Sequence, residues 1–135
     1  MKRLWVDANV LLRFLTRDPE DMAAKAASLM LRAERGEVLL VVSLLTVAEM
    51  VWVLKSVYRR SLSEIAQVVV PLLGADGLEV EDRELMIRAL ELARDKNVDF
   101  ADAVLALQAA RRDETVCTFD VTDFKKLPAE WAVPG

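Results

Sequence analysis

The alternation of apolar and polar positions along the chain predicts short strands separated by helices. Continuous apolar runs rich in Val and Leu, such as Val38 to Val42, are typical of strands buried on both faces of a sheet. Apolar positions three or four residues apart, as at Met86, Ala89, Leu90 and Ala93, are typical of helices with one buried face. The predicted strands are 4–6, 38–42, 78–80, 115–119 and 131–133.

Capping residues mark where the intervening helices begin. Ser61 and Glu64 form a capping-box pattern, Ser43 can cap the helix after the second strand, and Asp18 with Pro19 can open another. The predicted helices are 8–15, 19–35, 44–58, one from 61 to Pro71 or Gly74, 84–94, 99–112 and a short turn at 120–126.

Strands that alternate with helices predict a mostly parallel sheet covered on both faces, which is a three-layer α/β/α architecture. A chain of 135 residues can bury a conventional core, so we expect one domain over residues 1–135. Trp5 and Trp52 lie inside apolar runs and are expected in that core, as is the single cysteine, Cys117. The alternative for Trp52 is a surface that meets a second copy or a protein partner.

Composition narrows the chemistry. The sequence has no histidine, which excludes catalytic triads that use histidine and HExxH zinc sites. One cysteine and no apolar signal segment or membrane span favour a cytoplasmic protein without a membrane partner. The net charge of −4 argues mildly against nucleic acid as a partner, because phosphate binding usually requires a basic surface.

Four acidic residues from separate segments stand at positions that a parallel sheet would bring to one edge. Asp7 and Asp120 each follow a predicted strand, and ligands of such sheets bind beyond the carboxyl ends of the strands. Glu49 lies in the most apolar segment of the chain, and Asp102 lies in the first turn of an alanine-rich helix. Neither Glu49 nor Asp102 has a basic residue three or four positions away, so a helix-surface ion pair does not explain them.

Helix capping is the alternative role for each acid taken singly. Asp7 can cap the helix that follows it, Thr46 and Glu49 can form a capping box, and Asp99 can be a cap with Asp102 in the first turn. Capping does not require all of them at the same end of a sheet. Clustered carboxylates repel one another, and a divalent cation with oxygen ligands, Mg²⁺ or Mn²⁺, removes that penalty and can activate water.

The ordered motifs WVDANVLL at 5–12, SLLTVAE at 43–49, DFADAVLA at 99–106 and TFDVTDF at 118–124 resemble the PIN-domain nucleases. Within them, the chain resembles the VapC-type toxins of toxin–antitoxin pairs. The resemblance implies a PIN-like fold and an endoribonuclease that uses Mg²⁺ or Mn²⁺, one or two ions per site. It also implies a homodimer and inhibition by a cognate protein antitoxin.

The same resemblance implies roles for individual residues. Asp7, Glu49, Asp102 and Asp120 would be the catalytic, metal-binding acids, with Asn9, Asp99, Thr118 and Asp123 as auxiliary residues. Whether Asp120 or Asp123 is the fourth acid stays open. Basic residues near the acids could meet the RNA backbone, and Arg13, less than two helical turns after Asp7, is the first candidate.

Two other classes of function stay open at this point. The chain could be an RNA-binding or regulatory module, or a general RNA-processing nuclease, on the same fold. It could also be a Mg²⁺-dependent phosphotransfer domain in which Asp7 becomes phosphorylated, which would leave Glu49 without a role.

Overall fold

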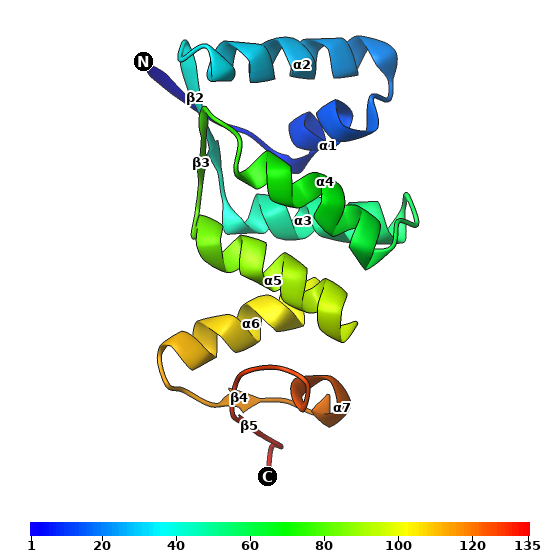
Figure 1. Cartoon of the computed structure of the whole chain (residues 1–135), viewed down its shortest axis with the longest axis vertical. Helices are drawn as coiled ribbons and strands as arrows, with labels where there is room; N and C mark the ends of the chain where they lie inside the picture. The colour runs from blue at the N-terminus through cyan, green and yellow to red at the C-terminus, as the bar shows by residue number, and fades with distance from the viewer. The chain divides into compact units, whose positions relative to one another are not determined.

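The computed structural model describes residues 1–135, and the chain forms two compact units (Figure 1). The N-terminal unit, Met1–Arg83, contains β1 (Lys2–Trp5), α1 (Ala8–Thr16), α2 (Glu20–Glu34), β2 (Val38–Val42), α3 (Leu44–Ser56), α4 (Leu62–Leu73) and β3 (Leu78–Val80). The C-terminal unit, Glu84–Gly135, contains α5 (Arg83–Lys96), α6 (Phe100–Arg111), β4 (Val116–Cys117), α7 (Val121–Phe124) and β5 (Trp131–Ala132). The division between the units falls after the first residue of α5.

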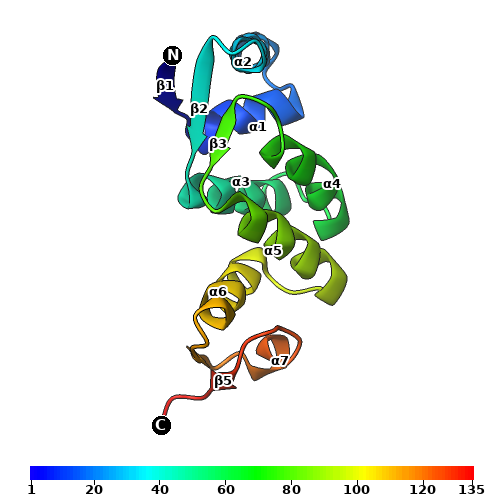
Figure 2. The same ribbon diagram turned by 60° about the vertical axis from the view of Figure 1, so that its left-hand side comes forward.

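The N-terminal unit is built on a parallel sheet with strand order β1-β2-β3. The strands follow one another in one direction, and right-handed crossovers then place both helical connections on the same face of the sheet. Figures 1 and 2 show α1 to α4 on that side. Leu40 and Leu78, paired in register, are at most 4% exposed on the covered face.

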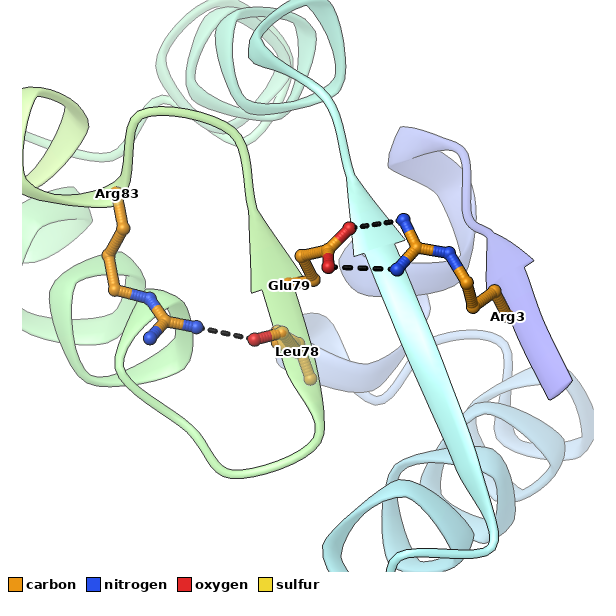
Figure 3. Close-up of polar contacts among 4 residues, drawn as sticks. All are labelled: Arg3, Leu78, Glu79 and Arg83. Atoms are coloured by element: carbon orange, nitrogen blue, oxygen red, sulfur yellow. Dashed lines mark hydrogen bonds and ion pairs between the residues drawn. The ribbon is translucent and has the colours of Figure 1, made fainter. Parts of the chain in front are cut away.

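The other face of this sheet carries charge. Arg3 on β1 reaches across β2 and donates two hydrogen bonds to the carboxylate of Glu79 on β3 (Figure 3). Trp5 is two residues after Arg3 on β1 and is therefore on the same face, where it is 72% exposed. The expectation that Trp5 packs in the core is wrong, because a three-residue apolar run does not reveal which of its residues alternates outward.

The caps of the helices follow the sequence signals closely. Ser43 accepts a hydrogen bond from the Thr46 amide, and Ser61 and Glu64 form both halves of a capping box. Pro71 lies inside the last turn of α4, which continues to Leu73 and ends at Gly74. Helix α2 begins one residue later than predicted, with Pro19 rather than Asp18 at the N-cap position.

The C-terminal unit packs α6 against β4 and α7. Val116 and Phe124 are buried in this unit, and the parallel strands β4 and β5 pair Val116 with Trp131. Strand β4 is shorter than the predicted 115–119, and Cys117 within it is exposed rather than buried. No helix in the structure is long and apolar enough to cross a membrane.

Candidate metal centre

Three carboxylates converge in the C-terminal unit. Asp102 lies in the first turn of α6, Asp120 is the N-cap of α7, and Asp123 is within α7. One carboxylate oxygen from each of the three lies within 4.8 Å of the others. We call these residues the aspartate cluster.

Local hydrogen bonds hold two members of the aspartate cluster in place. The Oδ1 atom of Asp120 accepts a hydrogen bond from the amide of Asp123 at 3.2 Å. The amide of Asp120 donates to the Thr118 hydroxyl at 2.9 Å, which fixes the turn that leads out of β4. Phe124, the last residue of α7, is 2% exposed and anchors this short helix in the unit. Thr118 therefore supports the position of Asp120.

The aspartate cluster is electrostatically strained. Partial burial raises the pKa of Asp102, and the nearby negative charges of Asp99, Asp120 and Asp123 raise it further. No basic side chain forms an ion pair with any of the three cluster residues. Asp99 occupies the N-cap position of α6 without a capping hydrogen bond from its side chain. Capping therefore does not account for the negative charge at this helix start.

Asp7 and Glu49 lie in the N-terminal unit. Asp7 follows β1, is exposed, and caps α1 by accepting a hydrogen bond from the Val10 amide at 3.2 Å. The Thr46 hydroxyl donates to the Val6 carbonyl at 3.4 Å, which ties the start of α3 to the residue before Asp7. Glu49 follows one helical turn after Thr46. Both acids therefore belong to the carboxyl end of this sheet.

Glu49 is exposed, although its sequence neighbours are apolar. It lies on one stripe of α3 with Leu45 and Trp52, which are 78% and 63% exposed. The Thr46–Glu49 capping box does not form, because Ser43 is the N-cap. The expected burial of Trp52 is also wrong. A helix that is apolar on nearly all sides gives no sequence signal for its outward stripe.

One acid at the same edge was not identified from the sequence. Glu81 follows β3 and accepts a hydrogen bond from the amide of Leu44, the first residue of α3, at 2.9 Å. The rule that selected Asp7 and Asp120, an acid directly after a strand, would also have selected Glu81. Its carboxylate is already used to stabilise the start of a helix.

Asp7, Asn9 and Arg13 line a common groove of about 430 Å³ between α1 and α2. This groove also includes Lys25, a cation that the sequence did not single out because it is six residues into a helix with no motif around it. The structure thus brings together Asp102, Asp120 and Asp123 in one unit and Asp7, Asn9 and Arg13 in the other. The joining of Asp7 and Glu49 with the aspartate cluster in one site stays a prediction.

The donor set of the aspartate cluster fits a hard divalent cation. Three carboxylates supply only oxygen ligands, which Mg²⁺ and Mn²⁺ prefer, and their uncompensated negative charge favours a cation. Histidine and clustered cysteine ligands, which would favour zinc, are absent from the sequence.

The PIN domain family matches residues 4–130, a span that includes every candidate site residue in both units. No curated protein sequence matches the chain closely enough to add a relative. PIN domains are generally metal-dependent nucleases that bind divalent ions through acidic residues, and the chain has such a carboxylate cluster. The match and the parallel sheet confirm the predicted PIN-like α/β/α fold class. The chain therefore belongs to the PIN domain family.

Proposed function

We propose that the chain is a VapC-type toxin, a single-domain cytoplasmic endoribonuclease that uses Mg²⁺ or Mn²⁺. In this proposal it acts as a homodimer and is inhibited by a cognate protein antitoxin. The observation that carries the nuclease part is the aspartate cluster with its raised Asp102 pKa and without a neutralising cation from the protein. The resemblance of the four acidic motifs to VapC-type toxins supports the finer assignment.

The residues divide the work of phosphodiester hydrolysis between them. Asp102, Asp120 and Asp123 would hold the metal, and Asp7 and Glu49 would complete its ligand set. When bound, a divalent ion supplies charge neutralisation at the phosphate and activates water for attack. Thr118 keeps Asp120 in position through its hydrogen bond to the Asp120 amide. Because the sequence has no histidine, we assign the carboxylates as the groups that would accept the proton of the attacking water.

The proposal is tested by cleavage of a panel of single-stranded and structured RNAs by the purified chain. Reactions contain Mg²⁺, Mn²⁺ or EDTA, and the variants are Asp7→Asn, Glu49→Gln and Asp102→Asn. We expect cleavage that requires metal and that each variant removes while retaining its circular dichroism spectrum. Metal binding without cleavage of any RNA in the panel would instead favour an RNA-binding module.

An apolar groove in the N-terminal unit supports a protein partner such as an antitoxin. It has a volume of about 690 Å³ and is lined by residues of α1, α2 and α4. Leu31 and Val68 in its lining are 43% and 44% exposed, so the groove presents apolar surface to a partner. An amphipathic helix could bury its apolar face there.

The partner assignment has its own test. Val68→Glu should abolish binding of the cognate antitoxin and leave RNA cleavage unchanged. Val57→Glu is the matched control, because Val57 is also exposed and lies outside the groove. Equal loss of antitoxin binding in both variants would show that the groove is not the binding surface.

A further inference from the structure

The groove between α1 and α2 combines two kinds of lining. One wall is apolar, and the remaining side chains are polar or charged and include one acid and two cations. The apolar residues are Val10, Met22, Ala26 and Leu29, and the others are Asp7, Asn9, Arg13 and Lys25. Helices α1 and α2 pack directly against each other, so the groove belongs entirely to the N-terminal unit.

The two cations of the groove are not neutralised by the protein. Arg13 donates one hydrogen bond, at 3.1 Å, to the backbone carbonyl of Asp18, and it forms no ion pair with a carboxylate. Lys25 is exposed and forms no ion pair. In a chain with a net charge of −4, two unneutralised cations in one groove favour an anionic ligand.

The apolar wall distinguishes this groove from a simple phosphate site. Met22 is 50% exposed, and Leu29, about two helical turns further along α2 in the same lining, is partly buried. A flexible, polarisable methionine adapts to flat, weakly polar surfaces such as the face of a nucleobase. A base can present this face only when it is unstacked from a duplex, which is how RNA sequences are usually recognised.

We propose that this groove seats one unpaired nucleotide of an RNA strand. The base lies against Met22 and Leu29, and the adjacent phosphate is held by Arg13 and Lys25. Asp7, the N-cap of α1, precedes Arg13 by six residues, about 9 Å along the helix axis, and the strand continues from the cations toward Asp7. The choice of RNA rests on the proposed function. The groove and its charges are observed independently of that function.

The test is direct binding of a fluorescein-labelled 12-nucleotide single-stranded RNA to the full chain, followed by fluorescence anisotropy. Ca²⁺ replaces Mg²⁺, because its flexible coordination is poorly suited to positioning an attacking water. We expect Lys25→Ala to weaken binding about three- to tenfold, and Arg13→Ala to do the same. Each should reduce the slope of log affinity against log salt concentration by about 0.7, the value for one phosphate contact with a single strand.

Lys55→Ala is the matched control, because Lys55 is another exposed helical lysine without an ion pair and lies outside the groove. It should leave affinity and salt slope unchanged. Met22→Ser should weaken binding of the RNA but not of an abasic strand of the same length, whereas Lys25→Ala should weaken both. A 12-base-pair RNA duplex should be insensitive to Met22→Ser.

The outcomes separate this inference from the proposed function. Normal binding by Lys25→Ala, or no binding of the single strand by the native chain, would overturn the assignment of the groove as a nucleotide site, even if the chain cleaves RNA. If Lys25→Ala weakens binding but the native chain cleaves no RNA, the assignment of the groove stands and the proposed nuclease activity is rejected. Equal effects of Met22→Ser on single strand, duplex and abasic strand would also overturn it. A deoxyribose strand that binds equally well would show that the groove does not distinguish RNA from single-stranded DNA, and would overturn the choice of RNA.

Discussion

Two groups of acidic side chains in this protein are in opposite electrostatic states. Both carboxylate oxygens of Glu79 accept hydrogen bonds from the guanidinium of Arg3, and these hydrogen bonds together with the positive charge lower the pKa of Glu79. Asp102 has no such partner, and burial together with neighbouring acids raises its pKa. The fold therefore stabilises the charged form of Glu79 and destabilises the charged form of Asp102.

The lack of a basic partner, together with the proximity of other carboxylates, distinguishes Asp102 from Glu79. Glu64 and Glu81 each accept a hydrogen bond from a backbone amide at a helix start, as Asp120 does, but neither of the two belongs to the aspartate cluster. The carboxylates of Asp102, Asp120 and Asp123 instead lie together without a basic side chain. A fold retains such a cluster most readily when a cation binds there and removes the repulsion.

Removal of one cluster acid should have the largest effect, and the effect should be on activity. Asp102→Asn should lower RNA cleavage by about a hundredfold or more, because metal-assisted charge stabilisation contributes several kcal/mol to the rate. Glu79→Gln should change cleavage by less than about twofold. Initial rates on one RNA substrate measure both. Similar losses of activity in the two variants would show that the different electrostatic states of Asp102 and Glu79 have no bearing on catalysis.

Metal binding should stabilise the native protein strongly. At about 100 times its dissociation constant, a ligand adds about 2.7 kcal/mol to the free energy of unfolding, or roughly 10 °C in Tm for a chain of this size. Differential scanning fluorimetry with Mn²⁺ and with EDTA measures the shift. Glu79→Gln should keep it and Asp120→Asn should lose most of it. An undiminished shift in Asp120→Asn would place the metal elsewhere.

The two groups should respond in opposite directions when metal is absent. In EDTA, Asp102→Asn removes the repulsion between Asp102 and its neighbouring carboxylates. This repulsion is about 1 kcal/mol, because Asp102 is partly exposed and solvent screens its charge. We therefore expect Tm to rise by about 3–5 °C. Glu79→Gln removes a favourable partner of Arg3 and should lower Tm slightly. A lower Tm for Asp102→Asn would indicate that Asp102 is a structural acid.

The pH dependence should be the smallest effect and should also differ in sign. Because the pKa of Asp102 is raised, the metal-free native state holds a proton more tightly than the unfolded state does at pH values just above the ordinary aspartate pKa of about 3.9. Asp102 therefore lowers the free energy of unfolding as pH rises from that value through its own raised pKa. Glu79, with a lowered pKa, contributes stability above the ordinary glutamate value of about 4.3 that is lost as pH falls. Thermal unfolding of Asp102→Asn and Glu79→Gln between pH 3 and 7 in EDTA separates the two slopes.

Local signals in the sequence were sufficient for most of the secondary structure. The capping box at Ser61 and the cap at Ser43 predict helix starts because side-chain oxygens satisfy amides within the same few residues. The apolar run at Val38 to Val42 predicts a central strand for the same local reason. Trp5 was misplaced because its exposure depends on register with β2, which is a long-range property.

The candidate site was predictable in part. Asp120 and Asp102 were found because strand ends and helix first turns are recognisable from sequence, and the structure brings them together with Asp123. Glu49 was selected because it lies in the most apolar segment of the chain, but it is exposed, since an almost wholly apolar helix does not reveal which side faces solvent. Lys25 was missed because only the packing of α1 on α2 places it beside Asp7.

The most direct measurement is a calorimetric titration of Mn²⁺ into the native chain, Asp102→Asn and Asp95→Asn at neutral pH. Asp95 is the matched control, because it is an exposed aspartate of the same unit that is already paired with Arg94. We expect the native chain and Asp95→Asn to bind Mn²⁺ equally and Asp102→Asn to bind at least about tenfold more weakly. Equal binding by all three proteins would contradict the assignment of the aspartate cluster as the metal centre.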